Sequence, residues 1–262
     1  MTAPTCDELR LRNPIMRVLL QRRLGLPIDV LREECEARGC RASLDSYGFH
    51  RSACTRTGRI HGRHAAALAP WRQVLSEAGY KVRTERMLRD SHLQVEQGDQ
   101  RRMDLVAAPG AQAPGAFRGL PLFCDVTVVS PHTKAGIARG SSANTNGAIL
   151  RTAANRKRGT YSDISDSGAA RLVVLGCEVY GRWCEDAILL VRQLAAAKAR
   201  EAPPALRASA RQAWSCRWWS LASVGVQRAI GEALLREGGV DLLSSPPPAG
   251  EPSLIDVVGD YV

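Results

Sequence analysis

Long apolar runs are missing from this chain. No stretch is long enough to span a bilayer, and residues 1–12 are polar, without the apolar segment of a secretory signal. Internal repeats are missing too. We therefore expect a chain that works inside the cell, does not cross a membrane and does not form a repeat array.

A disulfide pattern is also missing. The chain has eight cysteines, but they do not follow the spacing of a small extracellular disulfide-bonded domain. We expect them to be reduced, with some bound to metal and the rest buried. Cys124 and Cys177 lie inside apolar runs and are expected in the core.

Negative charge is scarce relative to positive charge. Lysine and arginine number 36 against 26 aspartates and glutamates, which gives a net charge of +10. Such an excess favours a polyanionic partner, DNA or RNA. The arginine-rich composition of a GC-rich genome would give the same excess, so this alternative stays open.

The most informative segment runs from Cys40 to His64, with Cys35 just upstream of it. Nine residues separate Cys40 from His50, three separate His50 from Cys54, and four separate Cys35 from Cys40. Three thiolates and one imidazole can close a tetrahedron around zinc. The Cys35–Cys40 spacing is looser than the usual Cys-x2-Cys, and unrelated core cysteines with a surface histidine are the alternative.

A basic segment follows the cysteines directly. Arg59, Arg63 and His64 lead into the helix expected at 62–79. The spacing of Arg59 and Arg63 puts them on one face, able to reach successive phosphates. A solvated basic face is the plain alternative. His61 or His64 could also replace Cys35, the cysteine with the loosest spacing, as a zinc ligand.

Apolar periodicity and turn residues outline an α/β core with helices on a mixed sheet. Strands are expected at 80–85, 102–107, 120–129 and 171–179. Helices are expected at 7–24, 28–37, 62–79, 148–161, 183–201 and 205–237. Pro70 falls inside the third helix, so its regular part is expected to begin near that proline.

The same reading divides the chain into five regions. They are an N-terminal helical segment (1–34), a zinc-knuckle-like basic segment (35–64), the sheet core (65–182), C-terminal helices (183–243) and a disordered tail (244–262).

In the C-terminal helices, Trp214 and Trp218 share a helix face, which favours core packing over a base-stacking platform.

Two strand carboxylates and a lysine are the candidate catalytic group. Asp104 begins an apolar strand and Asp125 interrupts the strongest one, where a carboxylate is costly unless it is hydrogen-bonded or binds metal. Adjacent strands could hold Mg²⁺ or Mn²⁺ between the two acids. Thr127 occupies the position where such sites often have lysine, so Lys157 of the next helix could supply the cation.

A purely structural role is the alternative for each of these residues. Asp125 could cap a turn, Asp104 could be a polar strand start, and Lys157 could be a solvated surface residue. Glu85 and Glu178 are secondary candidates for the same cleft, with structural roles the more ordinary reading. Arg156 and Arg158 lie on the surface of the helix that carries the lysine and are candidate nucleic-acid contacts.

Several of these motifs resemble the C-terminal part of site-specific non-LTR retrotransposon proteins. The resemblance rests on the Cys-x9-His-x3-Cys segment, the following Thr55–His64 segment and the Asp-Val-Thr-Val strand at 125–128. Lys157 on the helix ahead of Tyr161 also resembles the family's pattern, in which a lysine precedes a tyrosine. In that family a CCHC zinc knuckle precedes a restriction-like endonuclease of the PD-(D/E)XK superfamily, and the likeness covers roughly residues 20–237.

The resemblance implies a restriction-endonuclease-like fold and a nuclease that nicks DNA to expose a primer 3′ hydroxyl. It implies Mg²⁺ at Asp104 and Asp125, zinc at the knuckle, DNA or the element's RNA as partner, and action in the nucleus. Met103 stands where the family has proline, and the chain contains no Tyr-x-Asp-Asp polymerase segment. A catalytically inactive binding remnant or a structural fragment is therefore the alternative function.

Overall fold

The structure is a computed structural model that describes residues 7–28, 34–35, 37–56, 59–91, 93, 95–110 and 116–237. Its centre is a four-stranded sheet in the order β1-β2-β3-β4. The strands are β1 (Tyr80–Met87), β2 (Arg102–Pro109), β3 (Leu122–Val129) and β4 (Arg171–Glu178). Because β1, β2 and β3 pair antiparallel while β3 and β4 pair parallel, the sheet is mixed, as expected.

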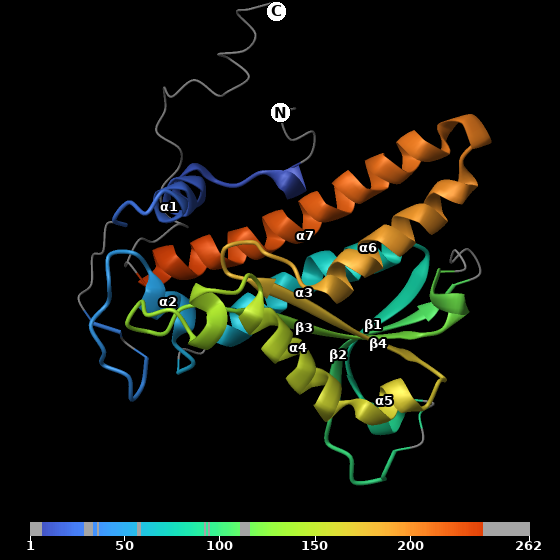
Figure 1. Cartoon of the computed structure of the whole chain (residues 1–262), viewed down its shortest axis with the longest axis horizontal. Helices are drawn as coiled ribbons and strands as arrows, with labels where there is room; N and C mark the ends of the chain where they lie inside the picture. The colour runs from blue at the N-terminus through green and yellow to red at the C-terminus, as the bar shows by residue number, and fades with distance from the viewer. Residues whose placement is uncertain are drawn as a thin grey trace, which may run out of the picture.

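Helices cover both faces of the sheet (Figure 1). Helices α3 (Arg59–Glu77) and α6 (Glu185–Lys198) lie on one face, and the long helix α7 (Arg207–Glu237) packs across both of them. Helices α4 (Ala148–Thr160) and α5 (Ser162–Asp166) lie on the other face. Helix α4 is the crossover between the parallel strands β3 and β4, which such a pair requires.

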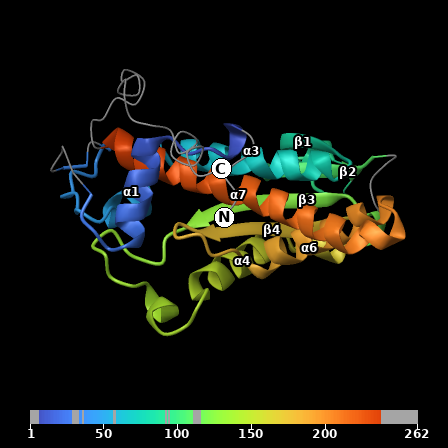
Figure 2. The same cartoon turned by 90° about the horizontal axis from the view of Figure 1, so that it is seen from above.

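The N-terminal elements gather at one end of α7. Helix α1 (Asn13–Arg23) packs against α7, and the short helix α2 (Phe49–Ala53) contacts it as well. Figure 2 shows α7 running the length of the molecule above the sheet, with α1 crossing near one end. Six short 3-10 helices complete the described part: Asp7–Leu9, Leu88–Asp90, Ala116–Gly119, Gly140–Ala143, Ala199–Glu201 and Pro204–Leu206.

The strand register aligns three acidic residues across the sheet. Strands β2 and β3 pair Leu105 with Cys124, so continuing the register by one residue sets Asp104 opposite Asp125. The β1–β2 register likewise sets Glu85 opposite Asp104, although that one pair is missing from an otherwise continuous ladder. Glu85 has a left-handed φ of 54°, which an ordinary residue adopts only at some cost.

Helix α3 does not begin at Pro70, as the sequence had suggested, but runs through it from Arg59. The ring of Pro70 faces Gly225 of α7, where an added Cβ would lie 2.2 Å from the proline Cγ. Glycine therefore lets the two helices approach closely. At the far end of α3, Glu77 accepts hydrogen bonds from Arg217 and from the indole of the fully buried Trp218.

The expected strands and most of the expected helices are confirmed. The helix expected at 28–37 is wrong in its described part, and two expected regions lie partly or wholly outside the described residues. Residues 34 and 35 lie in an extended segment bridged to Ser43, so the expected helix at 28–37 is wrong there; residues 29–33 lie outside the described part. The tail at 244–262 is also outside it. Cys124 and Cys177 are in the core, and Trp218 packs there as well. Helix α3 spans the boundary expected at residue 64.

Replacing Gly225 with alanine should destabilise the protein. The new methyl group would meet a rigid proline ring, and overpacking of this kind costs about 1–3 kcal/mol, more than the gain in helix propensity of at most about 1 kcal/mol. Gly62 of α3 has open space around its Cβ position, so Gly62→Ala is the matched control and should be neutral or stabilising. Denaturant unfolding measures both, and a Gly225→Ala variant as stable as wild type would contradict this packing.

Candidate functional site

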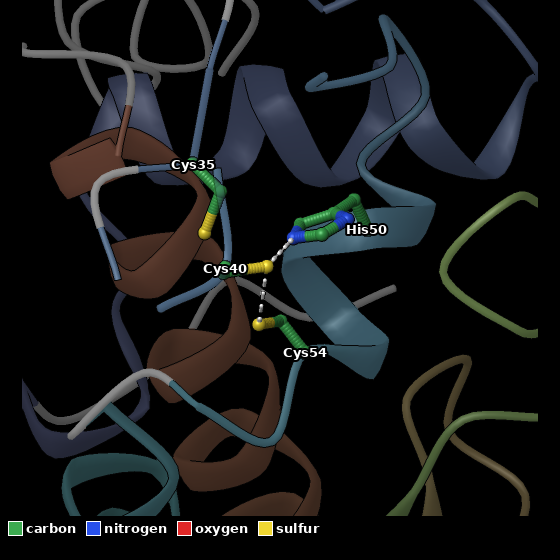
Figure 3. A group of neighbouring side chains, drawn as sticks. All are labelled: Cys35, Cys40, His50 and Cys54. Atoms are coloured by element: carbon green, nitrogen blue, oxygen red, sulfur yellow. Dashed lines mark hydrogen bonds between the residues drawn. The ribbon is translucent and has the colours of Figure 1, made fainter. Parts of the chain in front are cut away.

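The four predicted zinc ligands lie together (Figure 3). One ligand atom each from Cys35, Cys40, His50 and Cys54 lies within 4.8 Å of the other three. The Cys40 Sγ is 3.5 Å from the Nε2 of His50 and 3.8 Å from the Sγ of Cys54. Tetrahedral zinc with ordinary bond lengths would place sulfur about 3.8 Å from sulfur and about 3.5–3.6 Å from nitrogen. The cluster can therefore bind a metal such as zinc with little rearrangement.

A carboxylate organises the loop that presents His50. Asp45 Oδ1 accepts hydrogen bonds from the backbone N–H groups of Tyr47 and Phe49, both at 2.9 Å. Its Oδ2 accepts a third from the N–H of His50 itself, at 2.7 Å. The carboxylate thereby caps the start of α2, and this cap fixes the direction in which the imidazole leaves the helix.

Gly48 seats the same loop on the rest of the protein. Its φ of 72° lies in the left-handed region, and an added Cβ would lie 2.7 Å from the Cδ2 of Leu234 on α7. Both facts favour glycine at this position. The cysteine–histidine segment therefore rests against the end of the longest helix and is not an independent appendage.

The thiols of the cluster differ in their surroundings. A backbone hydrogen bond from Ala42 lowers the pKa of Cys40 below its usual value, which favours the thiolate that a metal needs. Burial raises the pKa of Cys35. Cys54 is fully buried. Because Cys35 converges with the other three, its looser spacing does not keep it out of the cluster.

A second polar group lies on the sheet around Asp125. This residue of β3 is only 2% exposed, and its Oδ2 accepts a hydrogen bond of 2.8 Å from Nζ of Lys157 on α4. Its Oδ1 is buried and makes no well-formed hydrogen bond among the described residues, although the Tyr161 hydroxyl lies near enough to interact with this carboxylate. Burial raises the pKa of Asp125, while Lys157 acts in the opposite direction. A buried carboxylate oxygen without a well-formed hydrogen bond is suited to a cation.

Asp104 lies beside it and has partners of its own. Its Oδ2 accepts hydrogen bonds from the backbone N–H of Val126 at 2.7 Å and from Nε2 of His64 at 3.0 Å. The hydrogen bond with Asp104 raises the pKa of His64 above its usual value. The carboxylate of Glu85 lies within 4.8 Å of both the His64 and the Asp104 ligand atoms. We call the residues His64, Glu85, Asp104, Asp125 and Lys157 the carboxylate cluster.

Tyr161 borders the carboxylate cluster at the end of α4. Its hydroxyl donates to the backbone carbonyl of Arg102 at 3.1 Å. Burial raises the pKa of Tyr161 to about 12, and the charges of Asp125 and Asp104 act in the same direction. The tyrosine is therefore neutral at physiological pH and fastens the end of α4 to the start of β2.

The candidate nucleic-acid contacts have different surroundings. Arg63 donates to the backbone carbonyls of Arg51 and Ser52, so its guanidinium closes the C-terminal end of α2. Arg156 is exposed, and Arg158 is exposed but paired with Asp186 at 2.8 Å. The side chain of Arg59 lies outside the described residues.

Glu178 lies apart from the carboxylate cluster. Asp125 pairs with Val174 in the β3–β4 register, so Glu178 is four residues farther along β4, or about 13 Å. It is buried, and Arg182 lies 3.4 Å from its carboxylate. Burial raises the pKa of Glu178. The glutamate and its arginine therefore form a separate pair at the end of the strand.

The sequence did not indicate that His64 contacts Asp104, because the two residues are forty positions apart. The motif that singled out His64 suggested phosphate binding or a zinc ligand. A helix that begins beside the cysteines and crosses over the sheet is needed to bring the imidazole to the start of β2. Only the packing of α3 on the sheet supplies that information.

Comparison of the chain with protein-family models and with curated proteins found no match. No helix within the described residues is both long and apolar enough to cross a membrane. Any family and any activity therefore have to be argued from the two clusters themselves.

The cysteine–histidine cluster should bind one zinc ion, because its ligand atoms already stand at tetrahedral distances. Cys40→Ser should reduce zinc affinity by about 100-fold or more and lower the melting temperature, since metal binding adds to folding stability. Zinc content and competition with a chromogenic chelator measure the effect. Cys216→Ser is the control, because that cysteine is exposed on α7. Wild-type protein that holds no zinc would contradict the assignment.

Proposed function

We propose that this chain is a divalent-metal-dependent DNA endonuclease domain with a restriction-endonuclease-like fold. The observation that supports it best is the carboxylate cluster. Asp104 and Asp125 lie on the adjacent strands β2 and β3, one position beyond the last paired residues Leu105 and Cys124. Lys157 of α4 donates to Asp125, and the buried Oδ1 of Asp125 makes no well-formed hydrogen bond among the described residues. Two acids and a lysine at one point of a mixed sheet suit hydrolysis of a phosphodiester.

The chemistry divides between a bound cation and the protein's own groups. Mg²⁺ or Mn²⁺, when bound, would polarise the scissile phosphate and lower the pKa of an attacking water. Asp104 and Asp125 provide the oxygen ligands that such cations prefer. The ammonium group of Lys157 is placed to balance the negative charge that develops on the phosphate, and its charge favours the ionised form of Asp125.

The surface of α4 supports a nucleic-acid partner. Arg151 and Arg156 are exposed on the same helix that carries Lys157. With the net charge of +10, they would draw the phosphate backbone toward the carboxylate cluster. Phosphate contacts of this kind position a strand without reading its sequence. Target choice would then depend on other surfaces, among them the cysteine–histidine segment.

The order of elements supports the resemblance to non-LTR retrotransposon endonucleases. A helix precedes three antiparallel strands, and a second helix crosses to a parallel strand, with the acids on β2 and β3 and the lysine on α4. The zinc-type cluster precedes the sheet, as that resemblance implies. We therefore include a retrotransposon origin, nicking of chromosomal DNA and a nuclear location in the proposal.

A binding or structural remnant without catalysis is the second candidate. In the structure each acid already has a basic partner, Lys157 for Asp125 and His64 for Asp104. A polar group that only stabilises the sheet would be balanced in the same way. The two functions differ in whether the cluster binds a cation and cleaves DNA.

Purified protein should nick supercoiled plasmid DNA in the presence of Mg²⁺ or Mn²⁺ and not in EDTA. Asp125→Ala should abolish nicking, and Lys157→Met should slow it by about 100-fold or more, since it removes a charge that stabilises the transition state. Lys81→Met is the matched control, because Lys81 is exposed on β1. DNA retained in a gel shift without any nicking would contradict the nuclease and favour the binding remnant.

A further inference from the structure

Three side chains of the carboxylate cluster form a mixed nitrogen and oxygen donor set. His64 of α3, Glu85 of β1 and Asp104 of β2 each offer one ligand atom, and these atoms lie within 4.8 Å of one another. Glu85 lies at the break in the β1–β2 ladder, and its carboxylate also pairs with Arg102 at 2.7 Å. His64 comes from a different layer of the fold. The group is therefore assembled by tertiary packing and is not an accident of local sequence.

The distances suit a six-coordinate ion. The Nε2 of His64 and Oδ2 of Asp104 are 3.0 Å apart. Bonds of about 2.1 Å at right angles would place neighbouring ligand atoms about 3.0 Å apart. The same contact serves as a hydrogen bond while no cation is present, so the imidazole is already oriented toward the carboxylate.

A further carboxylate lies beside this donor set. The charges of Asp104 and His64 both act on the buried Asp125. Asp125 is not one of the three residues whose ligand atoms lie within 4.8 Å of one another, so it neighbours the donor set without belonging to it.

We propose that His64 is a direct nitrogen ligand of the divalent cation in this cluster, together with Asp104 and Glu85. The inference deepens the proposed function and rests on it for the reaction, but the binding itself can be measured without the reaction. Mg²⁺ prefers oxygen ligands and keeps several waters, whereas imidazole suits transition metals. The cluster therefore selects Mn²⁺-type ions over Mg²⁺.

The test uses the full chain with its zinc cluster loaded and adds Mn²⁺ alone. Electron spin echo envelope modulation of the bound Mn²⁺ should show coupling to an imidazole nitrogen, and His64→Gln should remove it. Titration followed by the loss of the free Mn²⁺ signal should give an affinity at least about 10-fold weaker for that variant. Wild type should bind Mn²⁺ at least about 10-fold more tightly than Mg²⁺ in competition.

A second variant keeps the test decisive if His64→Gln does not fold. The Glu85 side chain is 39% exposed and its replacement by glutamine should leave folding intact while weakening Mn²⁺ binding about 10-fold. Glu201→Gln is the matched control, because this glutamate is exposed in the 3-10 helix that follows α6 and pairs with Lys198. Both variants are compared with wild type in the same titration.

Two results would overturn the inference. Bound Mn²⁺ without nitrogen coupling, or equal affinities for wild type and His64→Gln, would show that His64 only positions Asp104. Failure of the proposed function looks different: a nitrogen-coupled Mn²⁺ site in protein that never nicks DNA would retain the ligand assignment and reject the nuclease. Nicking without nitrogen coupling would retain the nuclease and reject His64 as a metal ligand.

Discussion

The buried charge of Asp125 is the constraint that the rest of the sheet accommodates. A carboxylate on a central strand, under a helix and away from water, is unfavourable unless other groups compensate it. Lys157 compensates it from α4, which ties the crossover helix to β3 at one point. Tyr161 then fixes the end of that helix to β2. Lys157 and Tyr161 therefore each fix one point of the helix against the sheet.

Two adjacent residues connect the cysteine–histidine cluster with the carboxylate cluster. Arg63 closes the end of α2, directly after His50 and its neighbours, while His64 hydrogen-bonds Asp104 on the sheet. Both belong to the first turns of α3. A metal bound by the cysteines would fix α2, and through Arg63 it would fix the helix that presents His64. The two clusters are thus joined mechanically by one short stretch of chain.

The sequence predicted the strands and most of the helices because their apolar patterns are long and their ends are marked by glycine or proline. It also predicted that Cys35, Cys40, His50 and Cys54 converge, since their spacing is a local property. It could not predict the path of α3 through Pro70, which depends on Gly225 of a helix 150 residues later. The contact between His64 and Asp104 was hidden for the same reason, and the Arg63 guanidinium binds backbone carbonyls that no motif reveals.

The most direct test of this account is a crystal grown with MnCl₂ and measured on both sides of the manganese absorption edge. The account predicts an anomalous peak in the carboxylate cluster, with Asp104 among the ligands. An occupied cysteine–histidine cluster beside an empty carboxylate cluster, at Mn²⁺ concentrations that support nicking, would contradict it. The buried carboxylate would then be a structural ion pair, and the activity would have to lie elsewhere.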